Sequence, residues 1–243
     1  MEKIFFPDVC PVCGRVIFPH EKICIECMGK IETIGEPKCE KCGKKLQSDE
    51  KLFCTDCDEV NHVFDRGICI FNYKEEMKEV LYRFKYKNKR CYSDFFGYVG
   101  AKKYRKLFRQ WKVKMIVPVP MYQKKQQRRG YNQAEEFAGS LTEYTDIPMA
   151  TDLIKRLRET KPQKGLNKEE RYKNLKNAFG VNQEKAKGVN SVLLVDDIYT
   201  TGSTIDACAK VLKAAGVEKV YFMCVAGVKC YTKVVTGVAN KIY

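Results

Sequence analysis

The stretch from Val192 to Gly216, which reads VLLVDDIYTTGSTIDACAKVLKAAG, constrains the fold more than any other part of the sequence. Its first four residues are apolar, as in a buried strand of a parallel sheet. Two adjacent acids follow, then a run of hydroxyl residues and glycine, and then a helical pattern that ends at Gly216. This order of strand, acidic turn, small-residue loop and helix is typical of an open α/β sheet, which binds ligands at the carboxyl ends of its strands.

The residue types in this unit indicate the class of ligand. A loop of small residues that opens a helix presents backbone N–H groups to an anion, and the helix N-terminus favours negative charge. The carboxylates of Asp196 and Asp197 can accept hydrogen bonds from sugar hydroxyls or face a Mg²⁺ ion. The alternative is an ordinary strand-to-helix turn with Asp, Ser and Thr as caps. No Gly-Lys-Thr follows, so the loop is not a Walker loop.

Residues Val192 to Thr204 resemble the phosphoribosyl pyrophosphate (PRPP) signature of type I phosphoribosyltransferases. The resemblance implies an α/β fold with a Rossmann-like parallel sheet flanked by helices, and Mg²⁺ bound together with PRPP. It implies that Asp196 and Asp197 hold the ribose hydroxyls. It also implies that the 5′-phosphate lies on the loop residues Thr200, Thr201, Gly202, Ser203 and Thr204.

Four Cys-x-x-Cys pairs occupy the first 62 residues, separated by gaps of similar length: Cys10/Cys13, Cys24/Cys27, Cys39/Cys42 and Cys54/Cys57. Two such pairs complete a tetrahedral zinc site, so the spacing predicts two zinc ribbons in tandem. Sequential pairing is the simplest assignment, cross-braced pairing remains open, and a redox or disulfide module is the alternative to metal. With eight cysteines available, His20 and His62 are not needed as ligands and are expected at the surface.

The charge is divided unequally along the chain, which carries a formal net charge of +15 over 243 residues. Residues 1–62 have a net charge of −3 and residues 63–243 have +18, and zinc thiolate sites add further negative charge to the first part. We therefore expect a zinc module at 1–62 with a structural or protein-docking role, and a basic phosphoribosyltransferase-like domain at 63–243. The sequence contains no evident signal peptide and no bilayer-spanning apolar run, so a cytoplasmic location without membrane insertion is expected.

A basic segment follows the short apolar strand predicted at 115–120. Residues 121–133 read MYQKKQQRRGYNQ and are expected to form a loop at the ligand edge of the sheet. The sequence VPVP followed by RRGYNQ resembles the ComF family of competence-type phosphoribosyltransferase homologues, which the zinc ribbons also fit. The resemblance implies pyrophosphate contacts from this loop; a basic surface loop is the alternative. The residues we expect there are Arg128, Arg129, Gly130, Asn132 and Gln133.

Residues 155–179 are dense in Lys and Arg and poor in apolar anchors, which predicts a mobile segment. The pattern Arg158, Thr160, Gln163, Leu166, Glu170, Arg171 and Asn174 resembles ComF sequences. By resemblance to phosphoribosyltransferases, the segment is expected to close over PRPP, with Arg158, Lys161 and Lys164 acting beside Asp196 and Asp197 in catalysis. For the part from Lys168 onward, a solvated helix is the alternative.

Other elements are predicted from apolar periodicity. Strands are expected at 68–73 and 218–228, and helices at 75–86, 93–109 and about 134–144.

Two functions remain open from the sequence. The first is an enzyme in which an acceptor that the sequence does not identify displaces pyrophosphate from PRPP. The second, which the resemblance to the ComF family implies, is a non-catalytic adaptor of DNA uptake that keeps the phosphate-binding loop, binds single-stranded DNA and docks a competence helicase or a recombination protein through the zinc ribbons. The basic charge favours DNA binding, as do the aromatic residues among the cations, namely Tyr82, Phe84, Tyr86 and Tyr92.

Overall fold

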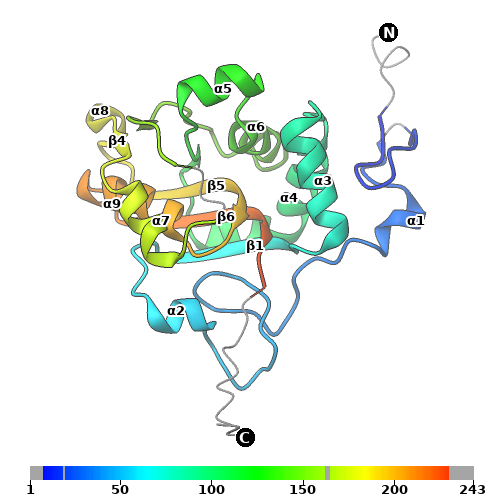
Figure 1. The fold of residues 1–243 in the computed structure, drawn as a ribbon, viewed down its shortest axis with the longest axis horizontal. Helices are drawn as coiled ribbons and strands as arrows, with labels where there is room; N and C mark the ends of the chain where they lie inside the picture. The colour runs from blue at the N-terminus through cyan, green and yellow to red at the C-terminus, as the bar shows by residue number, and fades with distance from the viewer. Residues whose placement is uncertain (1–7, 19, 162–164, 230–243) are drawn as a thin grey trace, which may run out of the picture.

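A four-stranded parallel sheet forms the centre of the computed structural model, which describes residues 8–18, 20–161 and 165–229 (Figure 1). The strand order is β1-β6-β5-β2, with every neighbouring pair parallel. The bounds of the strands are β1 Arg66–Asn72, β2 Met115–Pro118, β5 Ser191–Tyr199 and β6 Lys219–Gly227. The predicted strands at 68–73, 115–120, 192–195 and 218–228 all belong to this sheet.

Strand β5 shows why the sheet is buried on both faces. Its four apolar residues alternate, so that Val192 and Leu194 pack into one hydrophobic cluster and Leu193 and Val195 into another. The two outer strands are also covered along their edges. The Ile34 amide donates to the Ile70 carbonyl at 2.8 Å beside β1, and residues 148–150 pair with Ile116 of β2. These segments satisfy edge groups that would otherwise be open to another chain.

Three helices cover one face of the sheet: α3 (Glu75–Tyr86), α4 (Tyr92–Gln110) and α6 (Gln133–Thr145). All three were predicted within one or two residues. Helices α4 and α6 approach closely because Gly97 has no side chain: a Cβ there would lie 2.6 Å from the Cβ of Ser140.

Helix α9 (Ser203–Ala214) and the second zinc ribbon cover the opposite face (Figure 1). The ribbon contributes Cys39, Cys42, Leu46 and Cys54 to the same hydrophobic cluster that contains Val192 and Leu194. A small antiparallel pair, β3 (Ile154–Arg156) and β4 (Phe179–Val181), adds to this side, together with α7 (Lys168–Leu175) and α8 (Gln183–Ala186). Two short helices, α1 (Ile25–Met28) and α2 (Thr55–Glu59), belong to the ribbons.

The segment predicted as a basic loop at 121–133 contains a helix, α5 (Gln123–Arg129), so that prediction was wrong. Its sequence QKKQQRR consists entirely of good helix formers, and this propensity favours a helix despite the dense positive charge. Gly130 ends the helix in the left-handed conformation with φ 88°.

The segment at 155–179, which was predicted to form a mobile lid, contains regular secondary structure. It contains the end of β3, the whole of α7 and the start of β4. Helix α7 begins with a capping box between Asn167 and Glu170, in agreement with the helical alternative from Lys168 onward. Lys164 and Gln163 lie outside the described residues.

Among the described residues, no helix combines the length and the apolar character that a bilayer crossing requires.

Candidate ligand site and metal centres

The two adjacent acids lie at the carboxyl end of β5, where the sheet opens. The Asp197 amide donates to Asp196 Oδ1 at 2.8 Å, which fixes the first carboxylate against its own backbone. The Asp197 carboxylate pairs with Lys85 of α3, with Nζ and Oδ2 2.8 Å apart and both side chains 17% exposed. The acid pair is therefore held partly by a helix that is distant in sequence.

The environment of the acid pair shifts its ionisation. Burial, together with the neighbouring Asp197 carboxylate, raises the pKa of Asp196 to about 7. Burial opposes the charge of Lys85, but the Asp197 and Asp196 carboxylates outweigh it and raise the pKa of this lysine. Near neutral pH, Asp196 is thus poised between its acid and its carboxylate, and a bound cation or hydroxyl donor would favour the carboxylate.

The loop between β5 and α9 has the form expected of an anion site. Gly202 is the N-cap of α9 with φ 80°, and a Cβ there would lie 2.6 Å from the Tyr199 hydroxyl. The Thr200 hydroxyl accepts a hydrogen bond from Arg171 of α7 at 2.7 Å. The loop thus places hydroxyls, a helix N-terminus and an arginine together.

The basic segment after β2 lies across the opening. Asn132 caps α6 by accepting from the Ala134 amide at 3.2 Å, and its amide donates to the Val119 carbonyl at 3.1 Å. Arg129 donates to Gln133 and lies 4.9 Å from the centre of the Tyr86 ring. Burial and the nearby Arg129 lower the pKa of Lys125. Concentrated positive charge of this kind favours a polyanionic ligand.

One cavity of about 620 Å³ joins these segments, a volume within the usual range for small-ligand sites. Its lining includes most of the residues predicted for the ligand: Arg128, Arg129, Asn132, Gln133, Lys161, Asp196, Asp197, Thr200 and Thr204. Segments that lie some 70 residues apart in the sequence are therefore brought to a single site.

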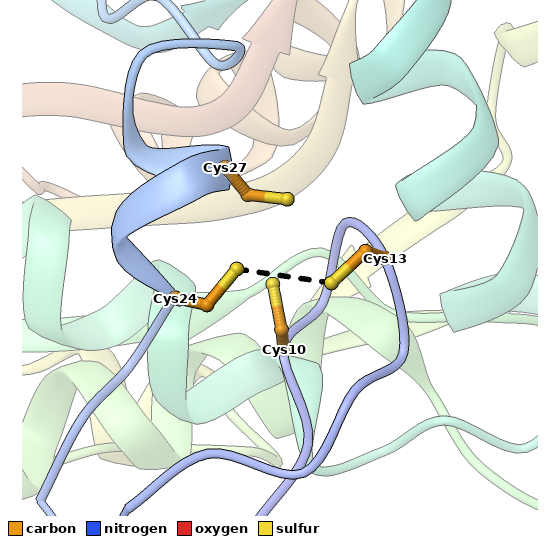
Figure 2. A group of neighbouring side chains, drawn as sticks. All are labelled: Cys10, Cys13, Cys24 and Cys27. Carbon is orange, nitrogen blue, oxygen red and sulfur yellow. Dashed lines mark hydrogen bonds between the residues drawn. The ribbon is translucent and has the colours of Figure 1, made fainter.

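The cysteines form two separate clusters, each built from sequential pairs. Within Cys10, Cys13, Cys24 and Cys27, and within Cys39, Cys42, Cys54 and Cys57, all Sγ atoms lie within 4.8 Å of one another. Figure 2 shows the first cluster, in which the four sulfurs face one centre and Cys13 and Cys24 are 3.7 Å apart. A zinc tetrahedron with Zn–S bonds of about 2.3 Å requires about 3.8 Å between sulfurs, so the geometry fits structural zinc. The structure groups the cysteines as sequential pairing predicts and not as a cross-braced arrangement would.

Comparison with known proteins agrees with this two-part architecture. A double zinc ribbon domain model matches residues 1–58, and a phosphoribosyl transferase domain model matches residues 132–241. Competence protein F of Haemophilus influenzae is 32% identical over 221 residues, which cover 89% of this chain and 95% of that protein. The chain belongs to the competence protein F (ComF) family.

Two further relatives extend this ComF family match. Competence protein ComFC of Bacillus subtilis is 29% identical, with 84% of this chain and 85% of the relative covered. DNA utilization protein YhgH of Escherichia coli K12 is 25% identical, with 90% and 96% covered. The similarity thus spans the ribbons and the sheet domain together.

Several residues predicted for the ComF site do not line its cavity. Gly130, Thr201 and Gly202 lie in the turns next to the cavity, and Ser203 begins α9. The Arg158 guanidinium donates to the Asn174 carbonyl at 3.0 Å and to the Lys176 carbonyl, so in this structure it holds the end of α7.

Four cationic residues of the ComF cavity were not among the predicted site residues: Lys85, Lys125, Arg156 and Arg171. Arg156 lies in the three-residue strand β3, where it donates to Thr160 and lies 5.2 Å from the Phe179 ring centre. Burial lowers its pKa. No local pattern marks Arg156, whereas Arg171 is part of the ComF-like pattern and Lys85 of the basic end of α3.

Two predictions about side-chain exposure were wrong. His62, expected at the surface, is buried, and its Nδ1 lies 2.6 Å from Oδ2 of the buried Asp206. Phe84 and Tyr92, expected to be available for stacking, are in the core of this ComF protein. Helical periodicity gives the reason for Phe84, since it shares the buried face of α3 with Met77, Val80 and Leu81.

Proposed function

We propose that this protein binds Mg²⁺–PRPP at the cavity and transfers its phosphoribosyl group to an acceptor, in the context of DNA uptake. The observation that carries the proposal is the single cavity that joins the acid pair, the loop at 200–204 and the basic segment at 125–133. The names of its relatives, competence proteins and a DNA utilization protein, support the link to DNA uptake.

The cavity offers a separate environment for each part of PRPP. The loop at 200–204 and the N-terminus of α9 suit the 5′-phosphate, and Asp196 and Asp197 suit the ribose hydroxyls. Arg128, Arg129 and the other lining cations suit the pyrophosphate. Mg²⁺, when bound, would neutralise pyrophosphate charge, and carboxylate and ligand oxygens are the donors that this ion prefers.

The reaction would exchange one bond at the anomeric carbon. A nitrogen of the acceptor forms a bond to this carbon as the bond to the pyrophosphate oxygen breaks, and the electron pair leaves with pyrophosphate. The cations of α5 would stabilise the developing charge, because preorganised positive groups act strongly on a leaving anion in a partly enclosed site. The carboxylates would hold the ribose in position for attack.

Calorimetric titration with PRPP in the presence and absence of Mg²⁺ tests the proposal. We expect Mg²⁺-dependent binding by the wild type and at least a tenfold (~1.4 kcal/mol) loss when Asp196→Asn and Asp197→Asn are combined, as for lost hydrogen bonds to charged groups. The exposed Asp49→Asn serves as the control and should bind normally. A wild-type protein that does not bind PRPP would refute the proposal.

A second function, single-stranded DNA binding, is favoured by an exposed tyrosine pair. Tyr82 and Tyr86 are 49% and 60% exposed, with ring centres 5.2 Å apart on the same side of α3. Tyr86 also lines the cavity beside Arg129. Exposed aromatic rings among cations provide stacking positions for bases.

Fluorescence anisotropy with a labelled oligonucleotide tests this second function. We expect affinity to fall steeply as salt is added, because Lys and Arg displace counterions from phosphates. The combination of Tyr82→Ala and Tyr86→Ala should weaken binding by about 1–3 kcal/mol, the usual size of a stacking contact. Phe53→Ala changes an exposed aromatic residue of the second ribbon and should have no effect. Binding that is insensitive to salt, or equal in all three proteins, would contradict this function.

The first ribbon offers a surface for a protein partner, which we propose to be a helicase or recombination protein. Four large apolar side chains on this ribbon are more than half exposed: Val16, Phe18, Ile25 and Met28. Exposed apolar groups gathered on a small module are typical of interaction sites.

A further inference from the structure

The second zinc ribbon lies against the side of the phosphate-binding loop that faces away from the cavity. Lys44, two residues after the last cysteine of the CEKC knuckle, is only 2% exposed. Its ammonium donates to the Thr200 carbonyl at 3.1 Å and pairs with Asp56 of the same ribbon at 2.6 Å. It also lies 5.5 Å from the centre of the Tyr199 ring. A buried cation is stable only when its hydrogen bonds are satisfied, so these partners fix its position.

The residues around this contact tie the ribbon to the first turn of α9. The Val63 amide donates to Asp206 Oδ1 at 2.8 Å, and His62 and the Tyr172 hydroxyl contact Oδ2 at 2.6 and 2.8 Å. Asp206 lies four residues after the loop glycine, Gly202, whose position permits no side chain because His62 and Tyr199 stand close to it. His62 and Val63, which follow the second ribbon, thus contact the first turn of α9 and the loop glycine.

The ribbon also contacts helix α7, which lies within the segment predicted as a lid. Lys168 at the start of α7 pairs with Glu59 at 3.0 Å and with Asp56 at 3.6 Å. Asp56 therefore faces both Lys44, which holds the loop, and Lys168, which holds α7.

The first ribbon makes contacts of similar strength in a different place. Its Lys22 pairs with Asp94 of α4 at 2.6 Å, and its Val12 carbonyl accepts from Arg83 of α3 at 2.7 Å. Among the described residues, these hydrogen bonds join the first ribbon to α3 and α4, and neither of them involves the loop at 200–204.

We propose that Lys44 is a positioning residue for the phosphate-binding loop, so that the second zinc ribbon forms part of the ligand site and the first does not. By holding the Thr200 carbonyl, the ammonium keeps the negative end of that dipole away from a bound phosphate. The loop can then present its donors to the anion without a competing acceptor. The identity of the anion rests on the function proposed above.

Two fragments of PRPP, here called half-ligands, distinguish a positioning role of Lys44 from a general effect on folding. Ribose 5-phosphate requires the loop at 200–204, whereas inorganic pyrophosphate requires the basic side of the cavity. In calorimetric titrations with Mg²⁺, Lys44→Met should weaken ribose 5-phosphate binding about tenfold, as for one lost charged hydrogen bond, and leave pyrophosphate binding within about twofold. The matched Lys22→Met, which removes the corresponding lysine of the first ribbon, should affect neither. Equal losses for both ligands, or no loss for either, would overturn the proposal.

A second variant and a second measurement test the proposal if Lys44→Met does not fold or if neither half-ligand binds. If Lys44→Met does not fold cooperatively, Asp56→Asn removes the charge that holds the ammonium and should give the same selective loss at smaller size. If the wild type binds neither half-ligand, the PRPP titration described above tests the proposed function separately. Lys44 is then tested by amide hydrogen exchange at 200–204, which should be faster in Lys44→Met and unchanged in Lys22→Met. Unchanged exchange in both would overturn the positioning role.

Discussion

At the scale of single residues, the site is defined by charges held where burial opposes them. Asp196 carries its proton to about pH 7 because it is buried beside Asp197, and Lys85 keeps its charge because of those carboxylates. Groups with shifted pKa values in a cleft are typical of functional sites, where stability is lost to maintain a useful arrangement. The loss of folding stability that the buried Asp196 carboxylate causes should be measurable.

Asp196→Asn is expected to stabilise the protein at pH 8 in Mg²⁺-free buffer. The pKa of Asp196 is raised to about 7 in the folded state, so from about pH 4 to 7 the folded chain holds a proton that the unfolded chain has lost. Stability therefore falls as pH rises through this window and is level above it. The variant lacks this loss, and its free energy of unfolding at pH 8 should be higher by about 2 kcal/mol, from about 1.4 kcal/mol per pKa unit reduced for relaxation. Urea unfolding at pH 5 and pH 8 checks this, and a variant equal to wild type at both pH values would contradict it.

At the scale of elements, short helices bring the cations to the cavity. Helix α5 places Lys125, Arg128 and Arg129 on one short turn, and Gly130 then redirects the chain so that Tyr131 is buried. The left-handed φ of 88° at Gly130, and not its contacts, makes glycine necessary, because a Cβ there would meet nothing within 4 Å.

Gly130→Ala and Gly139→Ala should therefore change stability in opposite directions. Neither position has an atom within 4 Å of an added Cβ, but only Gly130 has a positive φ. We expect Gly130→Ala to lower the free energy of unfolding by about 1 kcal/mol, the cost of forcing alanine into the left-handed region. Gly139 lies inside α6, so Gly139→Ala should raise it by up to about 1 kcal/mol. Thermal unfolding compares the two, and a shift of the same sign in both would contradict the backbone explanation.

At the scale of the whole molecule, local patterns were predictable and contacts between distant segments were not. The unit from Val192 to Gly216 and the eight cysteines have dense local signals, so the strand, loop and helix and the cysteine pairs were predictable, although spacing left open which pairs combine into one cluster. Arg156 and His62 are single residues whose roles depend on what the fold places beside them. No periodicity in the sequence indicates such neighbours.

The packing of the second ribbon against the sheet could not be predicted from local patterns either. Its charge and cysteine spacing predicted a separate module at 1–62, and that boundary remains a prediction. In the structure the ribbon shares a hydrophobic cluster with the sheet, and Lys44 contacts the loop at 200–204. A lysine next to a zinc knuckle is usually a solvated residue, so only the three-dimensional arrangement reveals its burial.

The most direct test of the central claim, that one cavity holds both ends of PRPP, is a ³¹P NMR titration of PRPP with the protein and Mg²⁺. The 5′-phosphate and the two pyrophosphate phosphorus atoms give distinct signals, so each end of the ligand reports separately. We expect all three signals to shift or broaden with the wild type. Arg128→Ala with Arg129→Ala should mainly reduce the effect on the pyrophosphate signals, and Thr204→Val should mainly reduce the effect on the 5′-phosphate signal. Signals that remain unchanged on addition of the wild-type protein would contradict the account.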